Sequence, residues 1–189
     1  SVLGNNLGTT AVSAASGHVS AAADAPLTAT NDSFVWGSIT KVTTGTSILR
    51  LMERGDISLD APMAPLIDPM LRAMKDADPS LNFSSAKDLW GDEAAKVTVY
   101  DLATMQSGIP DFDTAVPKEG GAGTDHLRQT LFDHPSTDFV PPKLLALPWV
   151  HTKKLIFSPG KNKSYSSTNF MLLGLVLAQK AGVKGWDEY

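Results

Sequence analysis

The chain has 189 residues, of which 42% are hydrophobic and 19% are charged, and its formal net charge is −4. This length and composition predict a soluble, globular protein with a substantial core of its own. The acidic balance gives no electrostatic reason to expect nucleic-acid binding. Because the chain contains no cysteine, thiol catalysis, disulfides and cysteine-based metal sites are excluded.

The N-terminal segment from Ser1 lacks the basic region and apolar core of a signal peptide, although a processed mature start looks the same. The compartment therefore stays open, and a secreted, periplasmic or organellar protein fits equally well. The most apolar run, residues 170–178, is too short to span a bilayer. The four histidines have no metal-ligand spacing, so no metal site is predicted.

The first predicted elements are a β-hairpin and a long helix. Residues 9–13 and 18–22 flank Ala15-Ser16-Gly17, which favours a hairpin turn. A helix is expected to begin at Ser38 and to end before Gly55, a suitable left-handed residue. Its apolar positions recur every three or four residues, which predicts that this stripe is buried. The stripe consists of Ile39, Val42, Gly45, Thr46, Leu49 and Met52.

Two shorter helices are expected in the middle of the chain. Proline suits a first helical turn, so Asp68-Pro69 is expected to start a helix that runs to Lys75. Thr98 is a predicted cap for a second helix, with Asp101 three residues later in an acidic variant of the capping box.

The segment 110–157 is rich in proline and glycine and predicts irregular structure, with short helices at most near 125–132 and 142–147. Such a segment is either a lid or binding loop or variable surface structure, and Gly120-Gly-Ala-Gly123 is interpreted as a flexible connector. From Ser166 the chain is apolar nearly all round up to Gly182, which predicts a core helix.

A serine three residues before a lysine on one helix face is one way to build a nucleophile without histidine. The pattern occurs three times, at Ser38/Lys41, Ser84/Lys87 and Ser158/Lys161. Pro159-Gly160 breaks the helical spacing of the last pair. The second pair lies where a loop is expected to enter a short exposed helix, so only Ser38 opens a long amphipathic helix.

Two interpretations of Ser38 and Lys41 follow from the pattern alone. In one, Ser38 lies at the positive end of the helix dipole and Lys41, one turn later, assists its ionisation after losing a proton. In the other, Ser38 is an ordinary capping residue and Lys41 is a solvated lysine. The pattern by itself favours the second interpretation.

Three segments in this order resemble the serine β-lactamase and penicillin-binding-protein superfamily. The similarity is to the branch with class C β-lactamases, D-alanyl-D-alanine carboxypeptidases, related esterases and eukaryotic β-lactamase-like proteins. The segments are Phe34-Val-Trp-Gly-Ser38-Ile-Thr-Lys41 with its continuation 51–62, then Val97 to Phe112 with the run Ser107-Gly-Ile-Pro-Asp111, and Phe157-Ser-Pro-Gly160 with Tyr165-Ser-Ser167 and Trp186-Asp-Glu-Tyr189.

The resemblance implies a role for each matching residue. Ser38 corresponds to the acylated nucleophile, Lys41 to its proton acceptor or relay, and Tyr165 to the tyrosine of a Tyr-x-Asn motif that shares the general-base role. The Ser38 N–H corresponds to half of an oxyanion hole. Ser167 replaces the substrate-binding asparagine, and Met105-Gln106 replaces a usual His-Thr pair, which is interpreted as a packing change.

The fold implied by the resemblance is α+β, of the β-lactamase/transpeptidase type, with a helical subdomain and part of an antiparallel sheet. The family's third motif, Lys-Thr-Gly or His-x-Gly, does not occur in the chain. Residues 1–189 are therefore expected to be the N-terminal portion of one catalytic domain. The remainder is expected further along the polypeptide or on a second chain.

The leading functional hypothesis is a serine hydrolase or acyl transferase that forms an acyl-enzyme at Ser38. Its expected partner is a small-molecule or peptide substrate, namely an ester, amide, β-lactam or D-amino-acid peptide, and neither a metal nor an organic cofactor is expected. One alternative is a catalytically silent relative that serves as a structural or assembly subunit. Another is a penicillin-sensing module that is acylated but turns over slowly.

Overall fold

The computed structural model of the protein describes residues 13–33, 37–113, 116–118, 121–124 and 138–185, together with Leu127, Asp133, Pro135 and Ser136. The chain divides into two compact units, residues 1–37 and residues 38–189. Each unit is described by itself.

The described part of the first unit consists of bends and turns. Gly17 has a φ of 99°, and the next residue, His18, forms an isolated antiparallel bridge with Leu27. The prediction of a strand at 18–22 is therefore wrong, because residues 19–22 form bends and the segment hydrogen-bonds to residues 26–28 through its backbone. Most of the other predicted strand, residues 9–13, lies outside the described residues.

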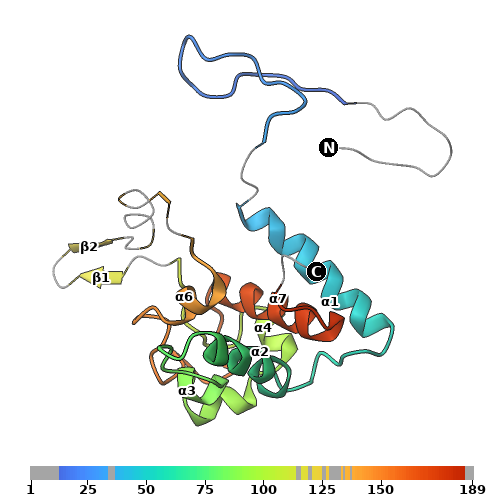
Figure 1. Ribbon diagram of the computed structural model, residues 1–189, viewed down its shortest axis with the longest axis vertical. Helices are drawn as coiled ribbons and strands as arrows, with labels where there is room; N and C mark the ends of the chain where they lie inside the picture. Colours follow the sequence, from blue (N-terminus) through green and yellow to red (C-terminus); the bar gives the residue numbers. More distant parts are fainter. Residues whose placement is uncertain are drawn as a thin grey trace. The chain divides into compact units, whose positions relative to one another are not determined.

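The second unit is built around α7 (Ser167–Ala181). The helices α1 (Thr40–Glu53), α2 (Ala64–Ala77) and α4 (Val99–Ala103) pack against it (Figure 1). Every residue of α7 from Met171 to Ala178 is buried, which confirms the predicted core helix. The helix ends, as predicted, at Gly182, whose φ of 71° is in the left-handed region.

Helix α1 forms over the predicted residues, but the predicted buried face is wrong. The buried residues are Ile48 and Leu51, on the face that meets α7. The apolar stripe lies on the other side, where Val42 is 70% exposed and Leu49 is 49% exposed. Periodicity located an apolar face correctly, but within the described residues no other element packs against α1 as α7 does.

Helix α2 begins earlier than expected, so Pro69 lies inside it rather than in its first turn. Pro65 occupies the N-terminal turn instead, where its missing N–H costs nothing. The helix buries a stripe that includes Ile67 and Leu71. Asp68 faces the next element, where its Oδ1 atom accepts a hydrogen bond from Ala86 N at 2.8 Å.

The next elements are α3 (Ala86–Trp90) and a 3-10 helix, η2 (Asp92–Lys96). The short helix near Ser84 was expected to be exposed, but Ala86, Leu89 and Trp90 are buried. These apolar side chains face the hydrophobic core, and Trp90 Nε1 donates a hydrogen bond to Val150 O at 2.9 Å.

Helix α4 confirms the predicted capping box. Thr98 Oγ1 accepts from Asp101 N at 3.1 Å, and Asp101 Oδ2 accepts from Thr98 N at 2.9 Å. These two bonds satisfy backbone donors at the helix start that have no partner within the helix.

The segment 110–157 contains one antiparallel pair of strands, β1 (Val116–Lys118) and β2 (Gly121–Thr124), and the helix α6 (Pro141–Leu145). Strand β2 corrects the interpretation of Gly120–Gly123 as a flexible connector. Helix α6 agrees with the prediction near 142–147, whereas the one near 125–132 lies mostly outside the described residues. The larger antiparallel sheet stays a prediction, since β1 and β2 are the strands found in the described part of the chain. None of the helices described there is long and apolar enough to cross a bilayer.

Gly108 is a position where the backbone conformation and the space both require glycine. Its φ is 74°, and a Cβ atom would lie 2.1 Å from Phe157 O. Gly55 has a similar φ of 76° but open space around it. We expect Gly108→Ala to lower the free energy of unfolding by about 3 kcal/mol or more, and Gly55→Ala by about 1–2 kcal/mol. Urea denaturation measures both values, and equal losses would contradict the role given to the contact with Phe157.

Candidate active site

Ser38 lies in a 3-10 turn, η1 (Gly37–Ile39), that leads directly into α1. Gly37 has a φ of 54°, a conformation that favours glycine at the entry to this turn. Lys41 lies in the first turn of α1. The serine is exposed and the lysine is half-buried, so the serine hydroxyl is accessible at the beginning of the helix.

The hydroxyl of Ser38 meets two other functional groups. Its Oγ atom lies 2.6 Å from the Tyr165 hydroxyl oxygen, and either oxygen can donate that hydrogen bond. Lys41 Nζ donates to the same Oγ atom at 3.3 Å and lies 4.9 Å from the centre of the Tyr165 ring. Two residues, Lys41 from the start of α1 and Tyr165 from a distant segment, therefore surround the Ser38 hydroxyl. The alternative of a capping serine with a solvated lysine does not describe this geometry.

Ser167 completes the cluster. It is the first residue of α7, and Lys41 Nζ donates a hydrogen bond to its Oγ atom at 3.3 Å. Lys41 thus links the serine at the start of α1 with the serine at the start of α7. Ser38, Lys41, Tyr165 and Ser167, which the sequence predicted as one site, lie together in the structure.

The environment of Tyr165 favours its ionised form. The adjacent Lys41 side chain, and next the hydrogen bond with Ser38, lower the pKa of the Tyr165 hydroxyl below its ordinary value. A lowered pKa increases the fraction of Tyr165 that is phenolate at moderate pH, and the phenolate is the form that can accept a proton. The arrangement can therefore move a proton from the Ser38 hydroxyl to the Tyr165 oxygen.

The other two Ser-x-x-Lys patterns have a different geometry. Ser84 Oγ donates to Asp88 Oδ2 at 3.0 Å, whereas Lys87 forms an ion pair with Asp92 at 2.6 Å. Ser158 begins a turn in which its carbonyl accepts from the backbone N–H of the lysine three residues later, at 3.1 Å. The sequence context of the three patterns therefore correctly selected Ser38 and Lys41 as the pair in which the lysine side chain reaches the serine hydroxyl.

The segment that follows α4 positions the start of α7 through contacts that sequence reasoning missed. Met105 has a positive φ of 62°, and its sulfur accepts from Ser166 N at 3.4 Å and from Asn169 Nδ2 at 3.5 Å. Ser107 Oγ donates to Asn169 Oδ1 at 2.7 Å, and both residues are buried. Met105 therefore does more than fill space, the role that the interpretation from the sequence gave it, because its sulfur accepts two hydrogen bonds at the start of α7. The signal in the sequence that could have revealed these contacts was Asn169, a polar residue within a mostly apolar helix.

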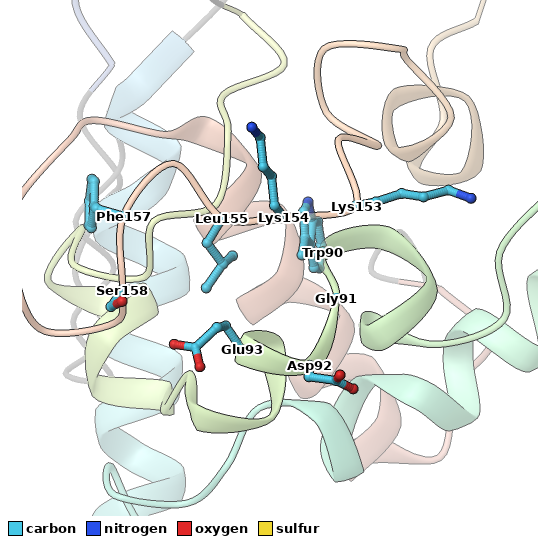
Figure 2. A pocket seen from close by; sticks show the side chains of 9 residues that line it. All are labelled: Trp90, Gly91, Asp92, Glu93, Lys153, Lys154, Leu155, Phe157 and Ser158. Atoms are coloured by element: carbon cyan, nitrogen blue, oxygen red, sulfur yellow. The ribbon is translucent and has the colours of Figure 1, made fainter.

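A cavity of about 300 Å³ lies elsewhere, between α3, η2 and the segment 153–158 (Figure 2). Its lining includes Trp90, Leu155 and Phe157, together with two carboxylates that already form ion pairs with Lys87 and Lys96. No residue of the predicted site lines it. The described residues also contain no group of three or more acidic or histidine side chains that suits a metal ion.

The family model for β-lactamases matches residues 3–189. The chain belongs to the β-lactamase family. A D-stereospecific amidohydrolase from Streptomyces sp. is similar to it in structure, with 26% sequence identity and a TM-score of 0.56 over 82% of this chain. A penicillin-binding-protein homologue from Pyrococcus abyssi also matches, with 26% identity and a TM-score of 0.48 over 81% of this chain.

This member of the β-lactamase family spans only part of the solved structures that it matches. It covers 39% of the amidohydrolase and 28% of the penicillin-binding-protein homologue. Membership in this family shows a β-lactamase/transpeptidase-like fold with helical content.

Proposed function

We propose that Ser38 is the nucleophile of a serine hydrolase or acyl transferase that works through an acyl-enzyme. The observation that supports this most directly is the 2.6 Å contact between Ser38 Oγ and the Tyr165 hydroxyl, with Lys41 Nζ at 3.3 Å from the same serine oxygen. A nucleophile with a base at hydrogen-bond distance, and a third group that orients and polarises that base, is the general signature of covalent catalysis.

In the proposed reaction, the Tyr165 phenolate takes the proton of Ser38 while the serine oxygen forms a bond with the substrate carbonyl carbon. The bond from that carbon to the leaving group then breaks, and the leaving group receives the proton from Tyr165. Lys41 stabilises the phenolate electrostatically and can relay protons. Water, or another acceptor in a transferase, then attacks the acyl carbon while Tyr165 accepts its proton. The bond between that carbon and Ser38 Oγ breaks, and Tyr165 returns the proton to Ser38 Oγ, which releases the acid or the transfer product.

The proposed substrates are small esters, amides, β-lactams or D-amino-acid peptides. The similarity to a D-stereospecific amidohydrolase supports an amide with a D-configured residue within this set. Ser167, which contacts Lys41, is proposed to touch the substrate. A serine hydroxyl has one donor hydrogen, whereas an asparagine amide offers separate donor and acceptor groups, so we expect a weaker hold on an amide than an asparagine gives.

We further propose that these residues are the N-terminal portion of a larger catalytic domain. The coverage of 39% of the amidohydrolase supports this, and so does the exposed apolar side of α1. On that side Val42 is 70% exposed and Ile39 is 58% exposed. Apolar stripes of this kind are normally covered in a complete domain.

The test is covalent labelling of the full-length protein with a fluorophosphonate and, separately, with a penicillin. Intact mass measures the adduct, and peptide mapping locates it. We expect an adduct on Ser38 with at least one reagent. A folded full-length protein without any adduct would favour the catalytically silent alternative, for which the serine at position 167 is the supporting observation. A stable penicillin adduct without turnover would favour a penicillin-sensing module.

A further inference from the structure

Asp111 lies next to the cluster without belonging to the four predicted residues. Its Oδ1 atom accepts hydrogen bonds from Ser167 N at 2.9 Å and from Asp113 N at 3.1 Å. The hydroxyl of the same Ser167 accepts a hydrogen bond from Lys41 Nζ at 3.3 Å. One residue, Ser167, thus connects the Asp111 carboxylate to the Lys41 ammonium, through its backbone on one side and its side chain on the other.

Two hydrogen bonds, one at the N–H group and one at the carbonyl oxygen of Phe112, hold the loop that carries Asp111 in place. Phe112 N donates to Thr168 Oγ1 at 3.1 Å, and Phe112 O accepts from Trp149 Nε1 at 3.1 Å. Thr168 is fully buried in α7. Since these bonds hold the residue that follows Asp111, the carboxylate is kept against the first turn of α7 rather than free to move into solvent.

Asp111 also acts on the site through its negative charge. A negative charge at the N-terminus of a helix is stabilised by the helix dipole. Burial raises the pKa of the Asp111 carboxyl, and the positive charge of Lys41 acts in the opposite direction. A carboxylate that interacts with Lys41 reduces the positive potential that Lys41 exerts on Tyr165.

We propose that Asp111 is a positioning residue of the Ser38 site, which fixes Ser167 at the start of α7 and limits how strongly Lys41 acts on the Tyr165 hydroxyl. The charged and titratable groups that act on this carboxylate are Lys41 from α1 and Asp113 from the same loop. The catalytic meaning of the inference rests on the proposed function. The electrostatic effect of Asp111 on Tyr165 does not rest on the proposed function, so it can be measured without any turnover of substrate.

The test is a titration of Tyr165 in the full-length protein, followed by the ultraviolet absorbance of tyrosinate. Subtracting the spectrum of the same protein with Tyr165→Phe cancels the other tyrosines. In Asp111→Asn the amide oxygen still accepts from Ser167 N, but the negative charge is gone. We therefore expect the titration midpoint of Tyr165 to move to lower pH, by about 0.5.

The matched control is Asp56→Asn, which removes the same charge beyond the C-terminal end of α1, about 20 Å along the helix from Ser38. We expect no movement of the midpoint in this variant. An unmoved midpoint in Asp111→Asn, or an equal movement in both variants, overturns the inference.

Covalent labelling of Ser38 separates this inference from the proposed function. Asp111→Ala removes the acceptor as well as the charge, so we expect labelling about 10- to 100-fold slower than in the wild type. If wild-type Ser38 is not labelled but the midpoint moves in Asp111→Asn, the proposed function fails and the role of Asp111 stands. If Ser38 is labelled and the midpoint does not move, the role of Asp111 fails and the proposed function stands.

Discussion

Ser38→Ala is expected to abolish covalent labelling and to lower turnover at least about 1,000-fold, because no other group can take the place of the attacking oxygen. Alanine also removes the partner that lies 2.6 Å from the Tyr165 hydroxyl. Steady-state hydrolysis of a chromogenic ester or β-lactam by the full-length protein measures the loss. Because Ser38 is exposed, we expect the variant to keep the wild-type stability within about 0.5 kcal/mol.

The control for this substitution comes from the same chain. Ser158 is also exposed and also stands three residues before a lysine, but its lysine is reached through a backbone turn. Ser158→Ala is expected to retain full labelling and turnover. Undiminished labelling of Ser38→Ala would assign the nucleophile to another residue and remove the basis of the proposed mechanism.

The approach of Ser38 and Lys41 could be predicted from the sequence because both lie within one turn of a helix, where spacing determines neighbours. The contact with Tyr165 joins residues 127 positions apart. No local pattern fixes such a contact, so its prediction depended on the order of the family motifs. Asp111 was part of a recognised motif, but its hydrogen bond to Ser167 depends on how α7 packs against the preceding loop.

The fold was predictable where local chemistry decides it. The capping box of Thr98 and Asp101 satisfies backbone donors within a few residues, and the uniformly apolar sequence of α7 requires a buried position. The buried face of α1 was not predictable in the same way. The helix has apolar residues on two sides, and only the packing of α7 on the side of Ile48 decides which of them is covered here.

Tyr165→Phe is expected to slow the acylation of Ser38 by about 100- to 10,000-fold, the usual contribution of a general base. Phenylalanine keeps the ring that lies 4.9 Å from Lys41 Nζ and removes only the hydroxyl. Stopped-flow or timed labelling with a penicillin measures the rate. Tyr100→Phe, in which an exposed tyrosine loses the same hydroxyl, is expected to acylate at the wild-type rate.

The pH profile of acylation distinguishes a base from a group that only orients Ser38. The active form of Tyr165 is the phenolate, so the rate should rise with pH up to the tyrosine's pKa and then level off. Lys41 and Ser38 lower that pKa, which places the rising limb below the ordinary tyrosine value near 10. Tyr165→Phe should lose the limb, and Lys41→Met should move it to higher pH because the stabilising charge is gone. A wild-type profile that stays flat up to pH 10, or a limb that survives in Tyr165→Phe, would assign the proton transfer to another group and leave Tyr165 with a binding role.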